Sequence, residues 1–210
     1  MAQMNLHLHS LEASLLNSNT LSMPIGQRRY SLCLTNPPFG IRSDLDRQQQ
    51  SNLMYPTSNK QLAFLQHIIT CLDVSGRAAV IVPDNVLFET GVAGSVRTHI
   101  LDNFDLHTIL RLPTGIFYAT GVKTSVLFFS RTRPTRETWV YDLRARDHTF
   151  TRKRPLRVAD LQDFIENFGL DGTAKRRETE YFRKYSRREL RDLEDRLDIL
   201  GTPIGETRQR

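Results

Sequence analysis

The sequence has few cysteines and no long apolar run, and both shortages exclude classes of protein. The 210 residues include two cysteines, Cys33 and Cys71, each inside an apolar segment and without Cys or His neighbours at metal-ligand spacing. We therefore expect two small core residues rather than a disulfide framework or a metal site, as in a reducing compartment. No apolar run approaches the roughly 20 residues that a membrane-spanning helix needs, and the N-terminus lacks the pattern of a signal peptide. A cytoplasmic protein with no membrane partner is expected.

Positive charge exceeds negative charge, mainly in the C-terminal part. The chain has 29 Lys and Arg against 23 Asp and Glu, a formal net charge of +6. From Arg131 onward there are 20 of these basic and 15 of these acidic residues. This balance permits an anionic partner such as DNA, but it also fits a merely basic protein without one.

Apolar periodicity predicts that helices and strands alternate over the first two thirds of the chain. This alternation favours an α/β fold, with a parallel sheet and helices on both faces. A compact apolar strand must end at Pro37, because proline has no N–H to donate to a neighbouring strand. The expected helices cover residues 3–11, 60–72 (with Ser58 as N-cap) and 93–101, and the expected strands cover residues 13–16, 31–35, 77–83, 107–112 and 124–129.

The pattern changes in the last third of the chain. An additional strand is expected over residues 137–143, followed by short, charge-rich helices over residues 159–168 and 186–197. Ser186 as N-cap with Glu189 three residues later has the spacing of a capping box. We therefore divide the chain into a first domain, residues 1–133, and a C-terminal extension, residues 134–210.

Two polar sequences follow expected strands. The first is the NPPF motif, Asn36, Pro37, Pro38 and Phe39, and the second contains Asp84 and Asn85. In parallel α/β sheets, ligands bind beyond the carboxyl ends of the strands, so position alone nominates both sequences. Asp84 and Asn85 are either at the border of the pocket or simply turn residues.

The NPPF motif has the groups needed to prepare an adenine amine for attack. The nitrogen lone pair of this amine is delocalised into the ring, so a site that methylates it needs two acceptors for its N–H groups. The Asn36 side-chain oxygen and the Pro37 carbonyl oxygen are such acceptors, and successive prolines keep them aimed. Phe39 offers a flat face on which a flipped base can stack, and Gly40 lets the backbone come close. The alternative is a turn that only ends the strand.

The segment LCLTNPPFG, residues 32–40, resembles the catalytic motif of the N6-adenine DNA methylases. More narrowly, it resembles the modification subunit of type I restriction–modification systems. Similar segments cover nearly the whole chain: residues 4–9, 79–88, 110–117, 139–144 and 198–199. The resemblance implies methyl transfer from S-adenosylmethionine to adenine N6 in DNA by in-line attack, with Asn36, Pro37, Pro38 and Phe39 as catalytic residues. It also implies a specificity subunit as partner, and a nuclease subunit as a further one.

The resemblance implies cofactor elements that this chain lacks. The family binds S-adenosylmethionine through a Gly-rich turn after its first strand and an acidic residue after its second, and no segment here supplies them. A third element normally has a Gly-Asp-Thr-like run, for which this chain has Ser18, Asn19 and Thr20, leaving Asn19 as the cofactor-binding candidate. The expected fold is a partial Rossmann-like class I methyltransferase sheet, strands three to seven without the first two.

Two functional hypotheses follow. The first is a DNA methyltransferase subunit that corresponds to the C-terminal half of a methylase. Such a half has an exposed apolar edge on its sheet. We expect that a partner chain with the missing N-terminal half covers this edge, that the protein forms a dimer, or that it is poorly soluble. The second is a catalytically inactive remnant or DNA-binding module. In that case the basic runs at residues 152–154 and 175–177 bind phosphates, although such runs are also typical of a solvated surface.

Overall fold

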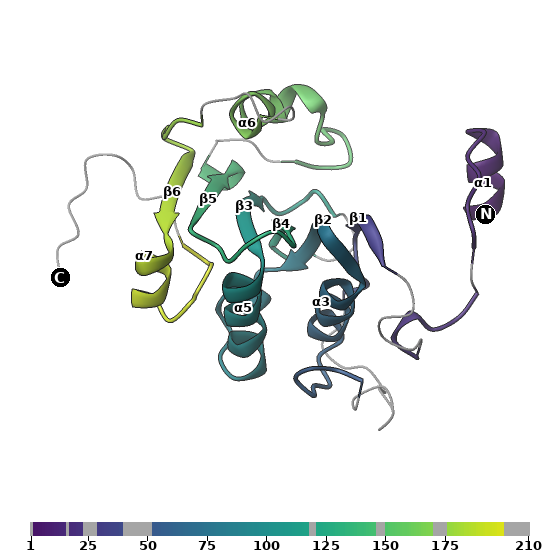
Figure 1. Ribbon diagram of the computed structural model, residues 1–210. Helices are drawn as coiled ribbons and strands as arrows, with labels where there is room; N and C mark the ends of the chain where they lie inside the picture. The colour runs from purple at the N-terminus through teal and green to yellow at the C-terminus, as the bar shows by residue number, and fades with distance from the viewer. Residues whose placement is uncertain are drawn as a thin grey trace.

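The computed structural model describes residues 2–15, 17–22, 29–39, 52–117, 121–145, 150–169 and 176–199. Within them, six strands form one sheet in the order β1-β2-β4-β3-β5-β6 (Figure 1). The strands are β1 (Tyr30–Thr35), β2 (Leu72–Pro83), β3 (Asp105–Leu112), β4 (Thr124–Ser130), β5 (Glu137–Asp142) and β6 (Phe182–Ser186). This is the expected α/β class, and four of the expected strands appear as β1 to β4.

The predicted parallel sheet is confirmed only in part, because β4 and β6 run antiparallel to their neighbours. A parallel return needs a crossover connection of a dozen or more residues, usually with a helix. The connection from β3 to β4 has only residues 113–123, so the chain turns back and inserts β4 between β2 and β3. β1, β2, β3 and β5 share one direction, and their carboxyl ends lie at the same edge of the sheet.

Helices cover both faces of the sheet, although unequally. In Figure 1, α3 (Lys60–Cys71) and α5 (Val92–Asn103) lie below the sheet and α6 (Gln162–Phe168) lies above it. The short helix α4 (Asn85–Phe88) precedes α5. Below the sheet, buried side chains of α3, α5, β2 and β3 form the larger core cluster. The N-cap of α3 is Asn59 rather than the predicted Ser58, because its side-chain oxygen accepts from the Gln61 and Leu62 amides.

The C-terminal extension continues the same sheet through β5 and β6. Above these strands, Tyr141, Phe150, Phe164 and Phe182 form the centre of a second core cluster. The predicted capping box is confirmed: Glu189 and Ser186 exchange hydrogen bonds at the start of α7 (Arg187–Asp192). The short helices η2 (Leu143–Ala145) and η3 (Val158–Leu161) complete the extension. The division at residue 133 stays a prediction.

A final segment, residues 193–199, lies across the ends of several elements, and we call it the C-terminal strap. Its Asp195 carbonyl accepts from the buried Arg97 of α5 at 2.9 Å. The Asp195 carboxylate accepts from Thr98 at 2.6 Å and pairs with Arg187. The Leu197 amide donates to the Leu87 carbonyl at 2.8 Å. The strap therefore joins α4, α5 and α7.

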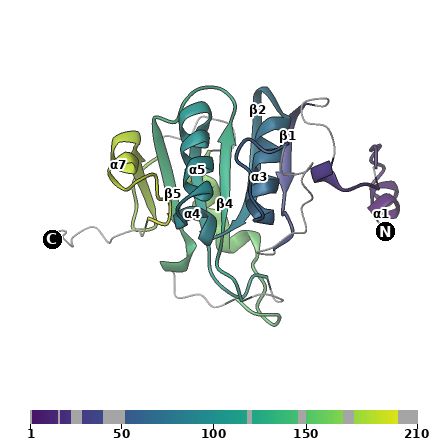
Figure 2. The same cartoon turned by 90° about the horizontal axis from the view of Figure 1, so that it is seen from below.

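The N-terminal segment contributes a helix but no strand. Figures 1 and 2 show α1 (Ala2–Leu8) standing apart from the sheet. The predicted strand at residues 13–16 was wrong over residues 13–15, which have no regular structure, and residue 16 lies outside the described residues. A strand is stable only when its backbone groups pair with a neighbour. Leu11 and Leu15 remain exposed, and the short helix η1 (Thr20–Ser22) packs through Leu21 beside Ala63 of α3.

The predicted exposed apolar edge is confirmed. β1 pairs with β2 alone among the described strands, so its other side has no neighbour. Its outward side chains Leu32 and Leu34 are 48% and 70% exposed, whereas Cys33 packs into the core. An unpaired apolar edge strand is a template for pairing with another chain.

Candidate active site

The NPPF motif leaves β1 at the edge where the parallel strands end. Thr35, the last residue of β1, pairs with Val80 of β2, which holds the motif beside the end of β2. Pro37 is buried, whereas Asn36 is exposed and has no hydrogen-bond partner among the described residues. Within the described part of the chain, nothing therefore competes with a ligand for the amide of Asn36. Gly40 lies outside the described residues.

Phe117 faces the aromatic residue of the motif from another loop. The rings of Phe39 and Phe117 are 5.7 Å apart with an interplanar angle of 86°, an edge-to-face contact. Phe117 follows β3, whose carboxyl end lies at the same edge as that of β1. Two aromatic rings that meet at an angle form the corner of an apolar slot, a shape that suits a planar ring. The sequence motif alone identified Phe39 and missed Phe117, because the contact joins residues far apart in the chain.

A cavity of about 840 Å³ opens beside Phe117 and is lined by residues 115–117, Gly121 and residues 150–152. Gly115 is needed here: its φ is +91°, and a Cβ at this position would lie 2.0 Å from the Phe150 carbonyl oxygen. Arg152, from the first predicted basic run, is exposed at this cavity. An apolar pocket with a cation at its border is able to hold a base and an adjacent phosphate.

Asp84 is neither a simple turn residue nor a free pocket residue, but the centre of an ionic network. Its carboxylate accepts from Arg144 Nη1 and Nη2 at 2.6 and 2.7 Å and from Ser125 Oγ at 3.2 Å. Burial raises the pKa of Asp84, but the hydrogen bonds and charge of Arg144, with help from Arg111 and Ser125, outweigh burial and lower it. Asp84 is therefore ionised at neutral pH.

Arg144 also holds both ends of the loop that carries Phe117. Its Nε donates to the Leu112 carbonyl at 2.9 Å and its Nη2 to the Thr124 carbonyl at 2.8 Å. These are the last residue of β3 and the first of β4. The bidentate pair with Asp84 fixes the plane of the guanidinium, so the network positions the base of this loop relative to the end of β2.

Arg111 extends the network to the C-terminal strap. It lies 3.7 Å from Asp84 and 3.6 Å from Asp142 at the end of β5, and its side chain is 5% exposed. Its Nη1 donates to the Ile199 carbonyl at 2.8 Å. The carboxyl ends of β2, β3 and β5 are thus tied together through charged side chains.

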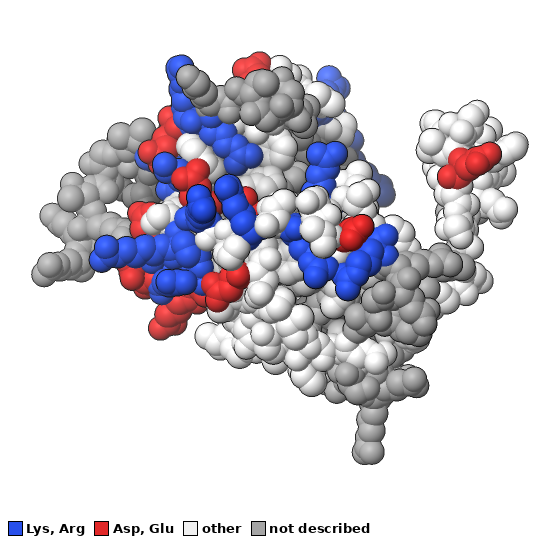
Figure 3. All heavy atoms as spheres, in the orientation of Figure 1, with Lys and Arg blue, Asp and Glu red and all other residues white. Residues whose placement is uncertain are grey.

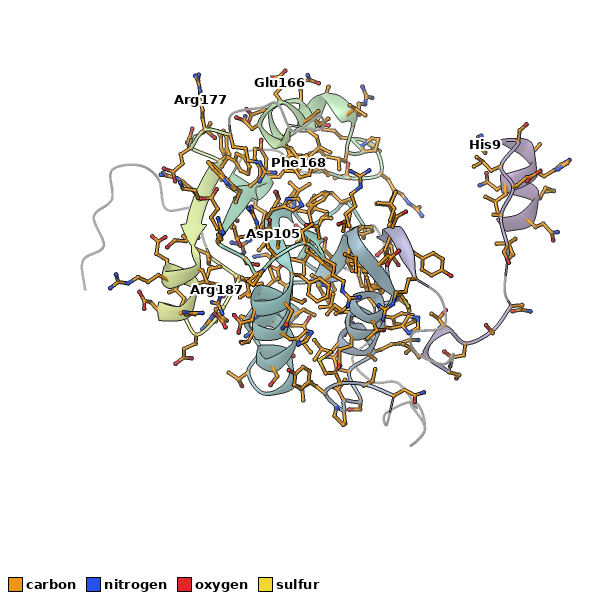
Figure 4. All side chains as sticks on the ribbon, viewed as in Figure 1. His9, Asp105, Glu166, Phe168, Arg177 and Arg187 are labelled. Atoms are coloured by element: carbon orange, nitrogen blue, oxygen red, sulfur yellow. The ribbon has the colours of Figure 1, made fainter. Side chains whose placement is uncertain are left out.

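The second predicted basic run differs from the first. Arg176 is half-buried: it donates to the His107 and Phe168 carbonyls and stacks on the Phe168 ring. Figure 4 shows Phe168 between α6 and the sheet, whereas Arg177 projects away from the molecule. Arg176 is therefore structural, and Lys175 lies outside the described residues.

Asn19, the predicted cofactor contact, is used in local structure. Its side-chain oxygen accepts from the Leu21 amide at 3.1 Å, which stabilises η1. Within the described part of the chain, no group of His, Cys, Asp and Glu is arranged to hold a metal ion. Across the same residues, no helix has the length and apolar character to cross a membrane.

The mixed α/β sheet matches solved methyltransferase structures over part of their chains. A class I S-adenosylmethionine-dependent methyltransferase structure from Listeria monocytogenes matches 67% of this chain and 45% of its own with a TM-score of 0.57; at 18% identity the match concerns the fold alone. The crystal structure of the type I restriction enzyme EcoKI M protein matches 95% of this chain and 50% of its own, with a TM-score of 0.82 and 38% identity.

The chain belongs to the N-6 DNA methylase family, whose model matches residues 1–202. It is 42% identical to the StySJI methylase subunit of a type I restriction enzyme from Salmonella typhimurium. It is 41% identical to the EcoKI methylase subunit from Escherichia coli. Both alignments cover 93% of this chain and 40% of the relative, so the chain spans less than half the length of these relatives.

Proposed function

We propose that this chain is the adenine-receiving part of a type I DNA methyltransferase specific for adenine N6. The observation that carries the proposal is the NPPF motif at the carboxyl end of β1, with Phe117 against Phe39, in a member of the N-6 DNA methylase family. The relatives are named as methylase subunits of type I restriction enzymes, which supports the same substrate class here.

In this proposal each residue of the motif has a separate role. The target adenine is rotated out of the duplex and stacks on Phe39, which contributes about 1–3 kcal/mol, while Phe117 limits the slot from the side. Asn36 Oδ1 and the Pro37 carbonyl accept the two N–H bonds of the amine and hold its lone pair towards the methyl donor. Pro38 keeps the backbone rigid, so that both acceptors stay in place. Arg152 is placed to pair with a phosphate next to the flipped base.

S-adenosylmethionine, when bound, supplies the methyl group, but the residues of this chain do not form its whole site. The sequence has no Gly-rich turn between a strand and a helix ahead of the motif. Asn19, the one candidate contact, has its oxygen engaged at η1. We infer that the remainder of the cofactor site comes from another polypeptide segment.

The exposed edge of β1 indicates where that segment binds. Leu32 and Leu34 project from the unpaired strand, and Ala79 and Ile81 of the adjacent β2 are only half-buried. We propose that a chain with the N-terminal half of the methylase fold pairs along this edge and covers this face. DNA, a specificity subunit and a nuclease subunit are the further proposed partners.

A methylation assay in a host without adenine methylation tests the proposal. The chain is expressed alone, and together with the complementary N-terminal part and the specificity subunit of the Salmonella typhimurium system. N6-methyladenine is then measured by mass spectrometry of the digested DNA. We expect the modified base only on co-expression, and none when the chain has Asn36→Ala.

Each result has a distinct meaning. Methylation by the chain alone would refute the need for a second segment. Methylation retained by Asn36→Ala, with both polypeptides present at wild-type amounts, would refute the role of the motif. Glu166→Gln serves as the control, because this exposed residue of α6 lies outside the candidate site and the basic runs and should leave methylation unchanged.

The second hypothesis, a DNA-binding module without activity, rests on the exposed run of Arg152, Lys153 and Arg154, of which Arg152 lines the cavity. It predicts DNA binding by the chain alone that weakens steeply with salt. Binding without methylation in the co-expressed system would favour this hypothesis over the first.

A further inference from the structure

A second cavity lies at the edge of the sheet opposite the NPPF motif, where the parallel strands begin. Its volume is about 390 Å³, within the range typical of small-molecule sites. Its lining comes from the residue before β1, the last turns of α3 and α5, and the residue after β4. Figure 3 looks onto this edge and shows Lys and Arg side chains along the sheet layer, between α6 and the helices below, with fewer Asp and Glu side chains among them.

Two arginines place adjacent cations at this cavity. Arg131 donates Nη1 to the Leu72 carbonyl at 2.8 Å, and Arg29 donates Nη1 to the same oxygen at 3.2 Å and to the Thr70 carbonyl at 3.1 Å. Because both bond to one oxygen, the two guanidinium groups lie side by side. Neither has a carboxylate partner among the described residues.

The donors of these arginines that bond to no described residue favour a particular kind of ligand. Each guanidinium has five N–H donors in a planar fork, and only Nη1 of each is engaged in the contacts above. One arginine is enough to cap the carbonyl groups at the C-terminal end of α3. Capping alone therefore does not explain why two arginines bond to the same oxygen. Paired planar forks suit an anion with several oxygens, and phosphate accepts from them in a bidentate manner.

The rest of the cavity offers an apolar, partly aromatic wall. Ile69 and Phe104 are buried, and the His99 ring lies 6.1 Å from the Phe104 ring. Burial lowers the pKa of His99, so its ring is uncharged at neutral pH and adds a flat surface. Asn103 Nδ2 donates to the His99 carbonyl at 3.0 Å, which leaves Oδ1 as an acceptor for a ligand N–H.

We propose that this cavity binds a nucleoside 5′-phosphate, with the phosphate on Arg29 and Arg131 and the base against His99 and Phe104. A cationic end, a flat wall and one amide acceptor match the three parts of such a ligand. The site is separate from the adenine slot, because it opens at the opposite edge of the sheet. It does not depend on the proposed methylation.

Titration of the full chain with 5′-AMP, followed by NMR of the histidine side chains, tests this site. We expect His99 resonances to shift with a dissociation constant below 1 mM, and adenosine and inorganic phosphate to bind about ten-fold more weakly or worse. Arg131→Gln should weaken AMP binding by a similar factor. Met54→Trp should block the cavity from its border, where Met54 is 45% exposed, without changing any charge.

Two control variants separate this site from general attraction and from the adenine slot. Arg136→Gln removes an exposed charge that does not line the cavity, and Phe39→Ala alters the other edge; both should bind AMP as the wild type does. Thermal unfolding of each variant checks folding, and Met54→Trp remains informative if Arg131→Gln is unstable. An unshifted His99 at millimolar AMP, an equal loss in Arg136→Gln, or inorganic phosphate binding as tightly as AMP would overturn the proposal.

Discussion

Replacing Asp84 by Asn tests whether the ionic network holds the carboxyl edge of the sheet together. The substitution keeps the size of the side chain and removes its charge. Arg144 then loses a bidentate partner, and Arg111 loses one of its two carboxylates. Arg144 still bonds to both ends of the loop that carries Phe117, but no carboxylate of Asp84 then fixes the orientation of its guanidinium.

The magnitude follows from the burial of the partners. Removing one member of a buried ion pair costs about 3–5 kcal/mol, because the other charge stays buried without compensation. The Arg144 and Asp84 side chains keep 15% and 16% exposure, and Arg144 retains the Leu112 and Thr124 carbonyls. We therefore expect a loss of about 3 kcal/mol, at the lower end of this range. For a chain of this length that is a fall in Tm of roughly 6–12 °C.

Urea unfolding at pH 7, with Asp105→Asn as the matched control, measures this loss. Asp105 pairs with Arg133, whose side chain is 55% exposed, so the control should lose at most about 1 kcal/mol. The folded state lowers the pKa of Asp84, so its contribution is complete above the ordinary value of 3.8 and is lost as pH falls through the lowered value. The difference between wild type and Asp84→Asn should therefore be constant from pH 8 to 5. Equal losses in the two variants, or a difference that already shrinks near pH 6, would refute the reasoning.

Three further predictions concern stability. Burial, and then the charge of Arg176, lower the pKa of His107 from 6.5 to about 4. The folded state therefore favours the neutral imidazole, and this contribution to stability is complete above pH 6.5 and is lost as pH falls towards 4. Between pH 7 and 5, urea unfolding should show that the wild type loses about 2 kcal/mol more than His107→Gln. Gly115→Ala should lower stability by about 2–3 kcal/mol through strain and contact with Phe150, whereas Gly121→Ala, at positive φ but with nothing within 4 Å, should lose about 1 kcal/mol; equal Tm shifts would contradict the contact. Ser186→Ala should cost about 1 kcal/mol by removing the cap of α7, and an unchanged urea midpoint would show that the cap contributes nothing.

Local patterns predicted the elements whose neighbours are inside the chain. The apolar run at the end of β2 and the helical spacing of α3 lie in the larger core, where burial and periodicity agree. The NPPF motif was predicted at a strand end because proline stops the ladder, and β1 does end at Thr35. Its assigned roles stay predictions.

The remainder depends on partners distant in the sequence. The direction of β4 follows from the connection to β3 and not from its own residues. β6 has only five residues, Phe182–Ser186, and its two aromatic residues flank two adjacent charged ones, so it has no apolar alternation that would separate it from a loop. Arg144 bonds to Asp84 across 60 positions and Phe117 meets Phe39 through another loop, so no local window contains either contact.

The C-terminal strap also determines when the protein can finish folding during synthesis. Arg97 is 3% exposed, and its Nε bonds to the Asp195 carbonyl, which is made 98 residues later. Arg111 likewise waits for the Ile199 carbonyl. Domains fold as units while the chain is made at about 5–20 residues per second. The ribosome therefore releases α5 and β3 several seconds before the last acceptors of their buried cations exist. Until then Arg97 has only the Val86 and Glu89 carbonyls among these acceptors. Just before the strap is made, the nascent chain has most of the large core residues of the lower layer, but it still lacks Leu197 and the carbonyl groups that bond to Arg97 and Arg111.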